Sequence, residues 1–302
     1  MKTVIPFVKM VAAGNDFLLV DVLHHALQPL ARRWPAVSRA LCDRHQGIGA
    51  DGLLVLERSR KASVRMRVFN SDGSEAQMCG NGARCVARLV SEWPARRRGL
   101  RISSPEVTIE TAAGTLSAVV AKGRIRMRWP DPTDVRLDMT LTVNGEQLNA
   151  ACVNTGVPHA VVSVSALETV DVNRVGRLLR HHEAFGPRGT NVDFIQTEAR
   201  DPSRLRVRTY ERGVEGETLA CGTGVVASAA IHALQQDAAA RQQRHANGRT
   251  RAYHVDVETR SGEVMTVALT VVAEGDGRRV RELTLDGTAR HICDGVAQWP
   301  QR

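Results

Sequence analysis

Aromatic side chains are scarce in this chain, at 4% of 302 residues. Few side chains are therefore available for stacking on bases. The formal net charge is +9, but the arginines are spread over the whole chain and form no basic domain. We therefore expect no nucleic-acid partner and interpret the charge as solvated surface.

Long apolar runs are absent as well. The first ten residues, "MKTVIPFVKM", are interrupted by Pro6 and Lys9, and their apolar part is too short for a signal segment or a membrane span. The sequence predicts a cytoplasmic protein with no membrane partner.

Cysteine is limited to six residues, too few for a disulfide scaffold in a chain of this length. Zinc sites need Cys-x-x-Cys or Cys/His pairs at ligand spacing, whereas here Cys79 and Cys85 are separated by five residues and the others are isolated. We expect no metal.

Two of these cysteines stand in matching contexts, "CGNGARC" at 79–85 and "CGTGVVA" at 221–227. Each is followed by Gly-x-Gly and then by small and apolar residues typical of a buried helix. Cys79 and Cys221 should each lie at a helix N-terminus, where unpaired N–H groups and the helix dipole favour a thiolate.

The similarity extends over a longer stretch. "FNSDGSEAQMCGNG" corresponds to "YERGVEGETLACGTG", and Asn15-Asp16-Phe17 corresponds loosely to residues 191–194. "WPDPTDV" at 129–135 interrupts strands and is a good candidate for a crossing between domains. We expect two half-domains: residues 1–130, completed by 282–302, and residues 131–281.

Two such halves facing each other would place Cys79 and Cys221 on opposite walls of a cleft. A thiol has an ordinary pKa of about 8.5, which suits proton transfer. One thiolate could remove a proton from a carbon acid while the opposite thiol donates one to the other face, inverting that carbon without a cofactor. The helix N-termini, with Gly80, Asn81, Gly222 and Thr223, would hold the adjacent carboxylate.

Six blocks in this order resemble the diaminopimelate epimerase family, over essentially the whole chain: "GNDF" (14–17), "GIGADGLL" (47–54), "FNSDGSEAQMCGNGARC" (69–85), "NTGVPH" (154–159), "TNVDF" (190–194) and "YERGVEGETLACGTG" (210–224). The resemblance implies an α+β fold of two pseudo-symmetric half-domains, each a mixed, mostly antiparallel sheet around a central helix, with the active-site cleft between them. It also implies a homodimer and cofactor-independent epimerisation of LL-2,6-diaminopimelate to the meso form, for lysine and peptidoglycan synthesis.

The same resemblance assigns roles to individual residues. Cys79 and Cys221 are the catalytic acid and base, and His159 and Glu211 tune their pKa values. The substrate-binding positions are Asn15, Asn70, Gly80, Asn81, Asn191, Glu211, Arg212, Gly222 and Thr223. Arg212 can hold a carboxylate in bidentate fashion.

The sequence departs from the family pattern at Val157, in the "VAAGNDF" approach to Asn15 and at Gly52, where some members have a glutamine. Val157 stands where the family often has an asparagine that contacts substrate. A second hypothesis therefore keeps the two-thiol chemistry but changes the amino acid, to a proline-type or histidine-type racemase or a related isomerase. A third, of another class, is a thiol redox or regulatory protein in which Cys79 and Cys221 form a reversible disulfide.

Overall fold

The computed structural model describes residues 3–27, 30–96, 106–244, 250–275 and 277–300. The chain divides into two compact units, each described here by itself. Unit 1 comprises Met1–Met127 and Gly287–Arg302, and unit 2 comprises Arg128–Asp286. The domain limits taken from the sequence, 130 and 282, stay a prediction. Over the described ranges, no helix is long and apolar enough to cross a membrane.

Unit 1 is a mixed sheet with the strand order β18-β1-β2-β3-β4-β6-β7. The pairs β2–β3 and β4–β6 are parallel, and the other pairs are antiparallel. Its strands are β1 (Thr3–Ala12), β2 (Asn15–Asp21), β3 (Gly52–Glu57), β4 (Val64–Asn70), β5 (Glu75–Ala76), β6 (Glu106–Thr111), β7 (Gly114–Ala121) and β18 (Arg290–Trp299), while β8 (Arg124–Arg128) leads into unit 2.

Unit 2 has the order β9-β10-β11-β12-β13-β15-β16-β17, with β11–β12 and β13–β15 parallel. Its strands are β9 (Thr133–Val143), β10 (Glu146–Asn154), β11 (Pro158–Ser163), β12 (Asn191–Glu198), β13 (Asp201–Glu211), β14 (Gly216–Thr218), β15 (Thr250–Glu258), β16 (Val264–Glu274) and β17 (Gly277–Thr288). Strand for strand, this repeats the pairing pattern of unit 1, from β18 and β9 onward. The predicted fold class is confirmed.

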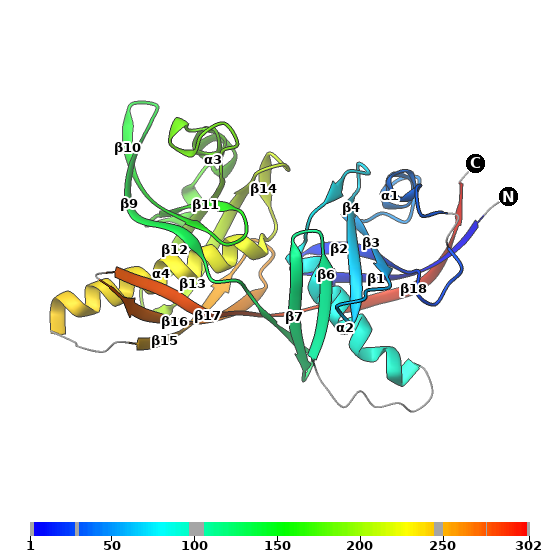
Figure 1. Ribbon diagram of the computed structural model, residues 1–302. Helices are drawn as coiled ribbons and strands as arrows, with labels where there is room; N and C mark the ends of the chain where they lie inside the picture. The colour runs from blue at the N-terminus through cyan, green and yellow to red at the C-terminus, as the bar shows by residue number, and fades with distance from the viewer. Residues whose placement is uncertain (1–2, 28–29, 97–105, 245–249, 276, 301–302) are drawn as a thin grey trace. The chain divides into compact units, whose positions relative to one another are not determined.

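Each unit places one long helix against its sheet (Figure 1). In unit 1, α2 (Gly80–Arg96) packs on β1, β2, β4, β6 and β7, and in unit 2, α4 (Gly222–Arg244) packs on β10–β13, β15 and β16. The start of α4 is almost wholly apolar and buried, from Val225 to Leu234, with small residues between the larger ones. Small side chains let a helix approach the sheet closely, so the N-terminus of each helix is held firmly at the strand ends.

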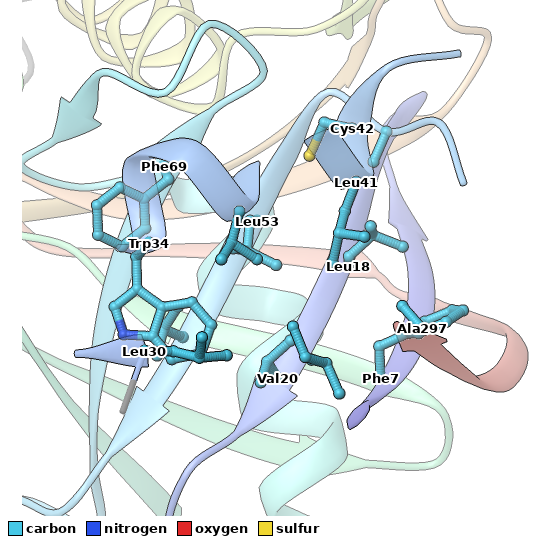
Figure 2. Close-up of a cluster of buried hydrophobic side chains, with 14 of the residues drawn as sticks. Phe7, Leu18, Val20, Leu30, Trp34, Leu41, Cys42, Leu53, Phe69 and Ala297 are labelled. Carbon is cyan, nitrogen blue, oxygen red and sulfur yellow. The ribbon is translucent and has the colours of Figure 1, made fainter. Parts of the chain in front are cut away.

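A second helix joins the two parallel strands on the opposite face of each sheet: α1 (Trp34–Cys42) between β2 and β3, and α3 (Val172–Arg180) between β11 and β12. Figure 2 shows the resulting core of unit 1, in which Trp34 and Leu41 of α1 pack on Leu18, Leu53 and Phe69. Such burial contributes about 1.5–3 kcal/mol for each large side chain.

The sequence predicts a helix over 27–45 and another over 170–185, and both observed helices are shorter. The expected helix over 27–45 begins only at Trp34, because Pro35 occupies the first turn, and residues 28–29 lie outside the described ranges. The expected helix over 170–185 ends at Arg180. A separate 3-10 turn, Glu183–Phe185, follows it, and the ring of His182 caps that turn by accepting from the amide of Ala184.

Candidate active site

Cys79 is the N-cap residue of α2. Its carbonyl accepts the amide of Ala83 at 2.8 Å, and its Sγ accepts the amide of Gly82 at 3.3 Å. The side chain is half-buried. The sulfur thus receives a backbone N–H that the helix itself leaves without a carbonyl partner.

Cys221 is the N-cap residue of α4 in the same way. Its carbonyl accepts the amide of Val225 at 2.9 Å, and its sulfur accepts a hydrogen bond from the amide of Gly224. The residue is 7% exposed, more deeply buried than Cys79. Both cysteines therefore stand where the sequence predicts, each directly before its long helix.

A chain of side-chain hydrogen bonds continues from Cys221. Its Sγ lies 3.2 Å from Oγ1 of Thr223, which lies 2.9 Å from Nε2 of His159. Nδ1 of His159 lies 2.7 Å from Oδ2 of Asp193, and the hydroxyl of Thr209 donates to Oδ1 of Asp193 at 2.7 Å. All the residues in this hydrogen-bonded series are buried except Thr223.

The surroundings of Cys221 disfavour a thiolate in the absence of ligand. Burial raises its pKa well above the ordinary value, and the negative charges of Glu211 and Asp193 raise it further. Burial also raises the pKa of the Glu211 carboxyl, an effect that a hydrogen bond with Thr218 opposes and the charge of Asp193 adds to. The thiol of Cys221 is thus the form that this pocket favours.

Arg212 and Asn191 are joined at the end of β13. The amide of Arg212 donates to Oδ1 of Asn191 at 2.8 Å, and Nδ2 of Asn191 donates to the carbonyl of Pro158 at 3.1 Å. Burial, followed by the charges of Arg180 and Arg188, lowers the pKa of the Arg212 guanidinium. Among the residues that the structure describes, no carboxylate forms an ion pair with Arg212, so this positive charge is available to a ligand.

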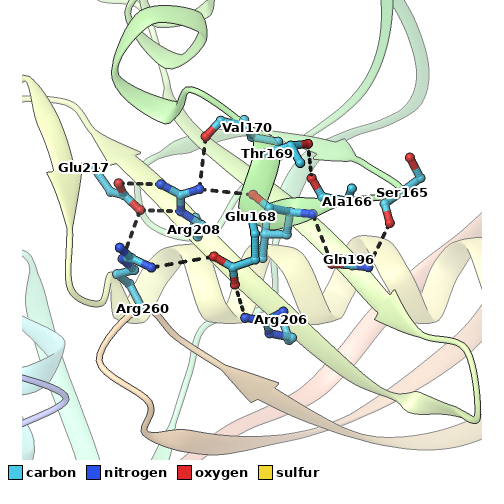
Figure 3. Close-up of polar contacts among 11 residues, drawn as sticks. Ser165, Ala166, Glu168, Thr169, Val170, Gln196, Arg206, Arg208, Glu217 and Arg260 are labelled. Carbon is cyan, nitrogen blue, oxygen red and sulfur yellow. Dashed lines mark hydrogen bonds and ion pairs between the residues drawn. The ribbon is translucent and has the colours of Figure 1, made fainter.

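The β13–β14 hairpin, which carries Glu211 and Arg212, is stabilised by a polar network (Figure 3). Nε and Nη2 of Arg208 donate to the two carboxylate oxygens of Glu217 at 2.6 and 2.8 Å. Nη1 of Arg208 donates to the carbonyls of Leu167 and Val170 at 3.1 and 3.0 Å. Such a bidentate pair, completed by carbonyl acceptors, restricts the hairpin that leads to Cys221.

In unit 1 a different series of side-chain hydrogen bonds ends at Asn81, two residues after Cys79. Nδ2 of Asn81 donates to Oδ1 of Asn15 at 2.7 Å, and Nδ2 of Asn15 donates to Oδ2 of Asp51 at 3.1 Å. Nη2 of Arg44 donates in turn to Oδ1 of Asp51 at 2.7 Å. Two predicted site residues are thus brought together, and Asp51 holds one of them.

Asn70 lies apart from that series, as the exposed last residue of β4, directly before the turn to β5. Its Nδ2 donates to Oγ of Ser74 at 2.9 Å. The remaining predicted positions are the first residues of the two long helices: Gly80 and Asn81 in α2, and Gly222 and Thr223 in α4. Within the described ranges, no three His, Cys, Asp or Glu side chains gather in a way that could hold a metal ion.

Known proteins are similar to this chain over most of its length. The family model described as diaminopimelate epimerase matches residues 7–129 and 151–276. The diaminopimelate epimerase of Aquifex aeolicus is 37% identical over 297 residues, which is 96% of each chain. That of Archaeoglobus fulgidus is 43% identical over 240 residues, 75% of this chain and 81% of its own length.

The chain belongs to the diaminopimelate epimerase family. It is therefore an isomerase. Solved structures of lower identity share the diaminopimelate epimerase-like fold alone. A hydroxyproline epimerase of Agrobacterium vitis aligns with a TM-score of 0.65 at 16% identity, covering 99% of this chain and 93% of its own. A PhzF-family phenazine biosynthesis protein of Bacillus anthracis aligns at 0.64 with 18% identity, covering 98% and 99%.

For this member of the diaminopimelate epimerase family, sequence reasoning missed three polar residues that support the predicted ones: Asp51, Asp193 and Thr209. The signal at Asp193 was an acidic residue inside the apolar strand "NVDFIQ", where a buried carboxylate needs a partner. Thr209 carried no comparable signal, because threonine is ordinary in a strand.

Proposed function

We propose that this chain converts LL-2,6-diaminopimelate to the meso form, with Cys79 and Cys221 as the two proton-transfer groups. The observation that carries the proposal is the repeated N-cap geometry. In both units a cysteine sulfur accepts the amide three residues later, at the start of a helix buried against its own sheet.

In this mechanism the two sulfurs address opposite faces of the substrate α-carbon. One thiolate removes the α-proton, and the other thiol delivers a proton to the opposite face, so the configuration inverts. After one turnover the two sulfurs have exchanged protonation states. The pocket of Cys221, which favours the thiol, supports Cys221 as the donor in the first half of the cycle. No metal or organic cofactor enters any step.

The carboxylate on the reacting carbon has to be stabilised as negative charge develops. Backbone amides at the starts of α2 and α4, at Gly80, Asn81, Gly222 and Thr223, are suited to this, since helix N-termini hold anions. The guanidinium of Arg212, with its neighbours Arg180 and Arg188, offers a binding site for the distal carboxylate of the substrate.

Val157 bears on which amino acid is bound. It cannot hydrogen-bond through its side chain, so a polar contact at this position has to come from elsewhere. Gly156 has a φ of 107°, and the carbonyl of Val157 already accepts the amide of Thr155 at 3.2 Å. The charge of Arg212 favours a substrate with an anionic distal end over proline.

The remaining expectations are that the enzyme is a cytoplasmic homodimer. They rest on the family resemblance and on the need to keep both thiols reduced. Sedimentation at micromolar concentration tests the dimer, and a monomer that turns over at the full rate would contradict it.

The deciding experiment is incubation with LL-2,6-diaminopimelate in D2O. We expect solvent deuterium at the α-carbon of the meso product, because a thiol exchanges its proton with solvent. A panel of L-amino acids run in parallel tests the racemase alternative. Absence of exchange with fully reduced enzyme would refute the epimerase.

The redox alternative predicts the reverse dependence on thiol state. If the two cysteines act as proton-transfer groups, quantitative bridging of Cys79 to Cys221 abolishes turnover. Turnover that survives complete bridging would contradict this mechanism.

A further inference from the structure

The duplicated architecture allows unit 2 to be compared with unit 1, position by position. Leu54 pairs with Leu19 across the parallel strands β2 and β3, and Asp193 pairs with Val161 across β11 and β12. The glycine three residues after each cysteine confirms this equivalence. A Cβ on Gly82 would meet Leu54, whereas one on Gly224 would meet Asp193. Asp193 therefore occupies the place of Leu54.

The neighbours of these two residues differ in the same sense. Phe17 of unit 1 corresponds to His159, because they pair with Gly52 and Asn191 in their respective units. Val68 likewise corresponds to Thr209, since they lie opposite Leu54 and Asp193. Beneath the cysteine helix, unit 1 therefore has three apolar side chains where unit 2 has three polar ones. No residue of either trio is more than 4% exposed.

This difference argues against a stabilising role for the polar trio. Burying an ionisable pair costs free energy of desolvation, and an apolar set of similar volume is usually as stable or more so. Unit 1 shows that the same backbone is filled well by hydrocarbon. The polar trio in unit 2 is therefore explained by what it touches, which is Thr223 and, through it, Cys221.

The hydrogen bonds have one consistent direction when Asp193 is the acceptor and the ring of His159 is neutral. An ionised carboxylate only accepts, so Nδ1 of His159 carries the proton shared with Asp193. Nε2 of a neutral imidazole is then an acceptor and receives the hydroxyl proton of Thr223. The oxygen of Thr223 in turn accepts the thiol proton of Cys221. The chain runs in one direction from sulfur to carboxylate.

We infer that Asp193 is a positioning residue of the reaction, which fixes the tautomer of His159 and thereby, through Thr223, keeps Cys221 protonated and its proton oriented. This inference rests on the proposed function, in which Cys221 is a proton donor. Asp193 itself touches no substrate in this account.

The titratable groups around Cys221 in unit 2 are His159 on β11, Asp193 on β12 and Glu211 on β13. Replacing Asp193 by asparagine keeps the shape, removes one negative charge and lets an N–H face Nδ1 of His159. The tautomer then reverses, Nε2–H donates to Thr223, and Thr223 donates to sulfur. Both changes favour the thiolate.

The test is the pH dependence of carbamidomethylation of Cys221 by iodoacetamide, resolved by peptide mass spectrometry in the reduced full-length protein. We expect the midpoint of Asp193→Asn to lie at lower pH than that of the native protein. On the acid side of both midpoints, Cys221 should react about tenfold faster, the equivalent of one pH unit. Repeating the pair in a Glu211→Gln background removes any response of that carboxylate.

Thr209→Val is the matched control. It removes one hydrogen bond to the same carboxylate but leaves its charge and the contact with His159 in place, so its midpoint should move much less. A folded Asp193→Asn protein with the native midpoint would overturn the inference, as would an equal shift in Thr209→Val.

If Asp193→Asn fails to fold, the native protein still decides the question. Nitrogen-15 NMR of labelled histidine, assigned with His159→Gln, should show protonated Nδ1 and unprotonated Nε2. Protonation of Nε2 would refute the inference. Neither measurement uses a substrate, so a failure of the epimerase proposal, seen as absent deuterium exchange, is distinguishable from a failure of this one.

Discussion

The carboxylate of Asp193 lies directly beneath Gly224, so close that a Cβ at Gly224 would come within 2.4 Å of Oδ1. Gly224→Ala should therefore displace the carboxylate or the start of α4, at about 1–3 kcal/mol of unfolding free energy. The matched change, Gly82→Ala, meets the terminal methyls of Leu54 at 3.1 Å and Cβ of Cys79 at 3.5 Å, an ordinary contact distance, and alanine favours the helix. Its cost should be below about 1 kcal/mol. Urea unfolding of both variants compares them, and equal losses would contradict the assigned packing.

Removing either catalytic thiol should abolish turnover without unfolding the protein. Cys79→Ala and Cys221→Ala each delete one proton-transfer group, which contributes roughly 10²–10⁴-fold to rate. Cys293→Ala, at an exposed position on β18, should keep native turnover. Initial rates with circular dichroism as the folding check suffice. A Cys221→Ala enzyme with native kcat would contradict the two-thiol mechanism.

Glu211→Gln should lower activity and raise the free energy of unfolding near neutral pH. Burial raises the pKa of Glu211 above its ordinary value of 4.5, so its stabilising contribution is present below that pH and is lost as pH rises through the folded-state pKa. The variant should therefore match the native protein in acid and gain unfolding free energy relative to it toward neutral pH. Denaturant unfolding at several pH values measures this.

The same substitution should lower kcat/KM by about 10–100-fold, since a charged hydrogen-bonding group in a desolvated site contributes roughly 1.5–3 kcal/mol. A stability difference independent of pH would show that the carboxyl is not perturbed.

Arg208→Ala should loosen the hairpin that carries Glu211 and Arg212. It removes the bidentate partner of Glu217, which retains the longer ion pair with Arg260. It also removes a side-chain donor to two carbonyls that still accept backbone amides, and we expect a loss of about 1–3 kcal/mol with a raised KM. Arg206→Ala removes a more exposed ion pair with Glu168 and should cost at most about 1 kcal/mol. Thermal unfolding and Michaelis kinetics separate the two, and a larger effect at Arg206 would contradict this account.

The sequence was most informative where residue pattern and local geometry coincide. Gly-x-Gly after a cysteine, followed by small apolar residues, placed both helix N-termini correctly. The β-rich run "VRMRVFN" predicts a strand over 64–70, and the structure has β4 with those limits. Helix ends were predicted less well. Pro35 decides the start of α1, and the separate turn capped by His182 ends α3 at Arg180, while apolar residues continue into the flanking turns.

The supporting residues were beyond sequence reasoning for a different reason. Asp193 and Thr209 are neighbours only through strand register, and Asp51 meets Asn15 across 36 positions of the chain. Nothing in the spacing of these residues encodes such contacts.

The apolar trio of unit 1, Phe17, Leu54 and Val68, provides an internal control for the polar trio of unit 2. In a library selected for growth, these three positions should tolerate other apolar side chains of similar volume. Apolar side chains at His159, Asp193 and Thr209 should not be tolerated. Exchanging one trio for the other would then change the surroundings of one cysteine while leaving those of the other cysteine as they are. A fold without an internal duplication does not allow this.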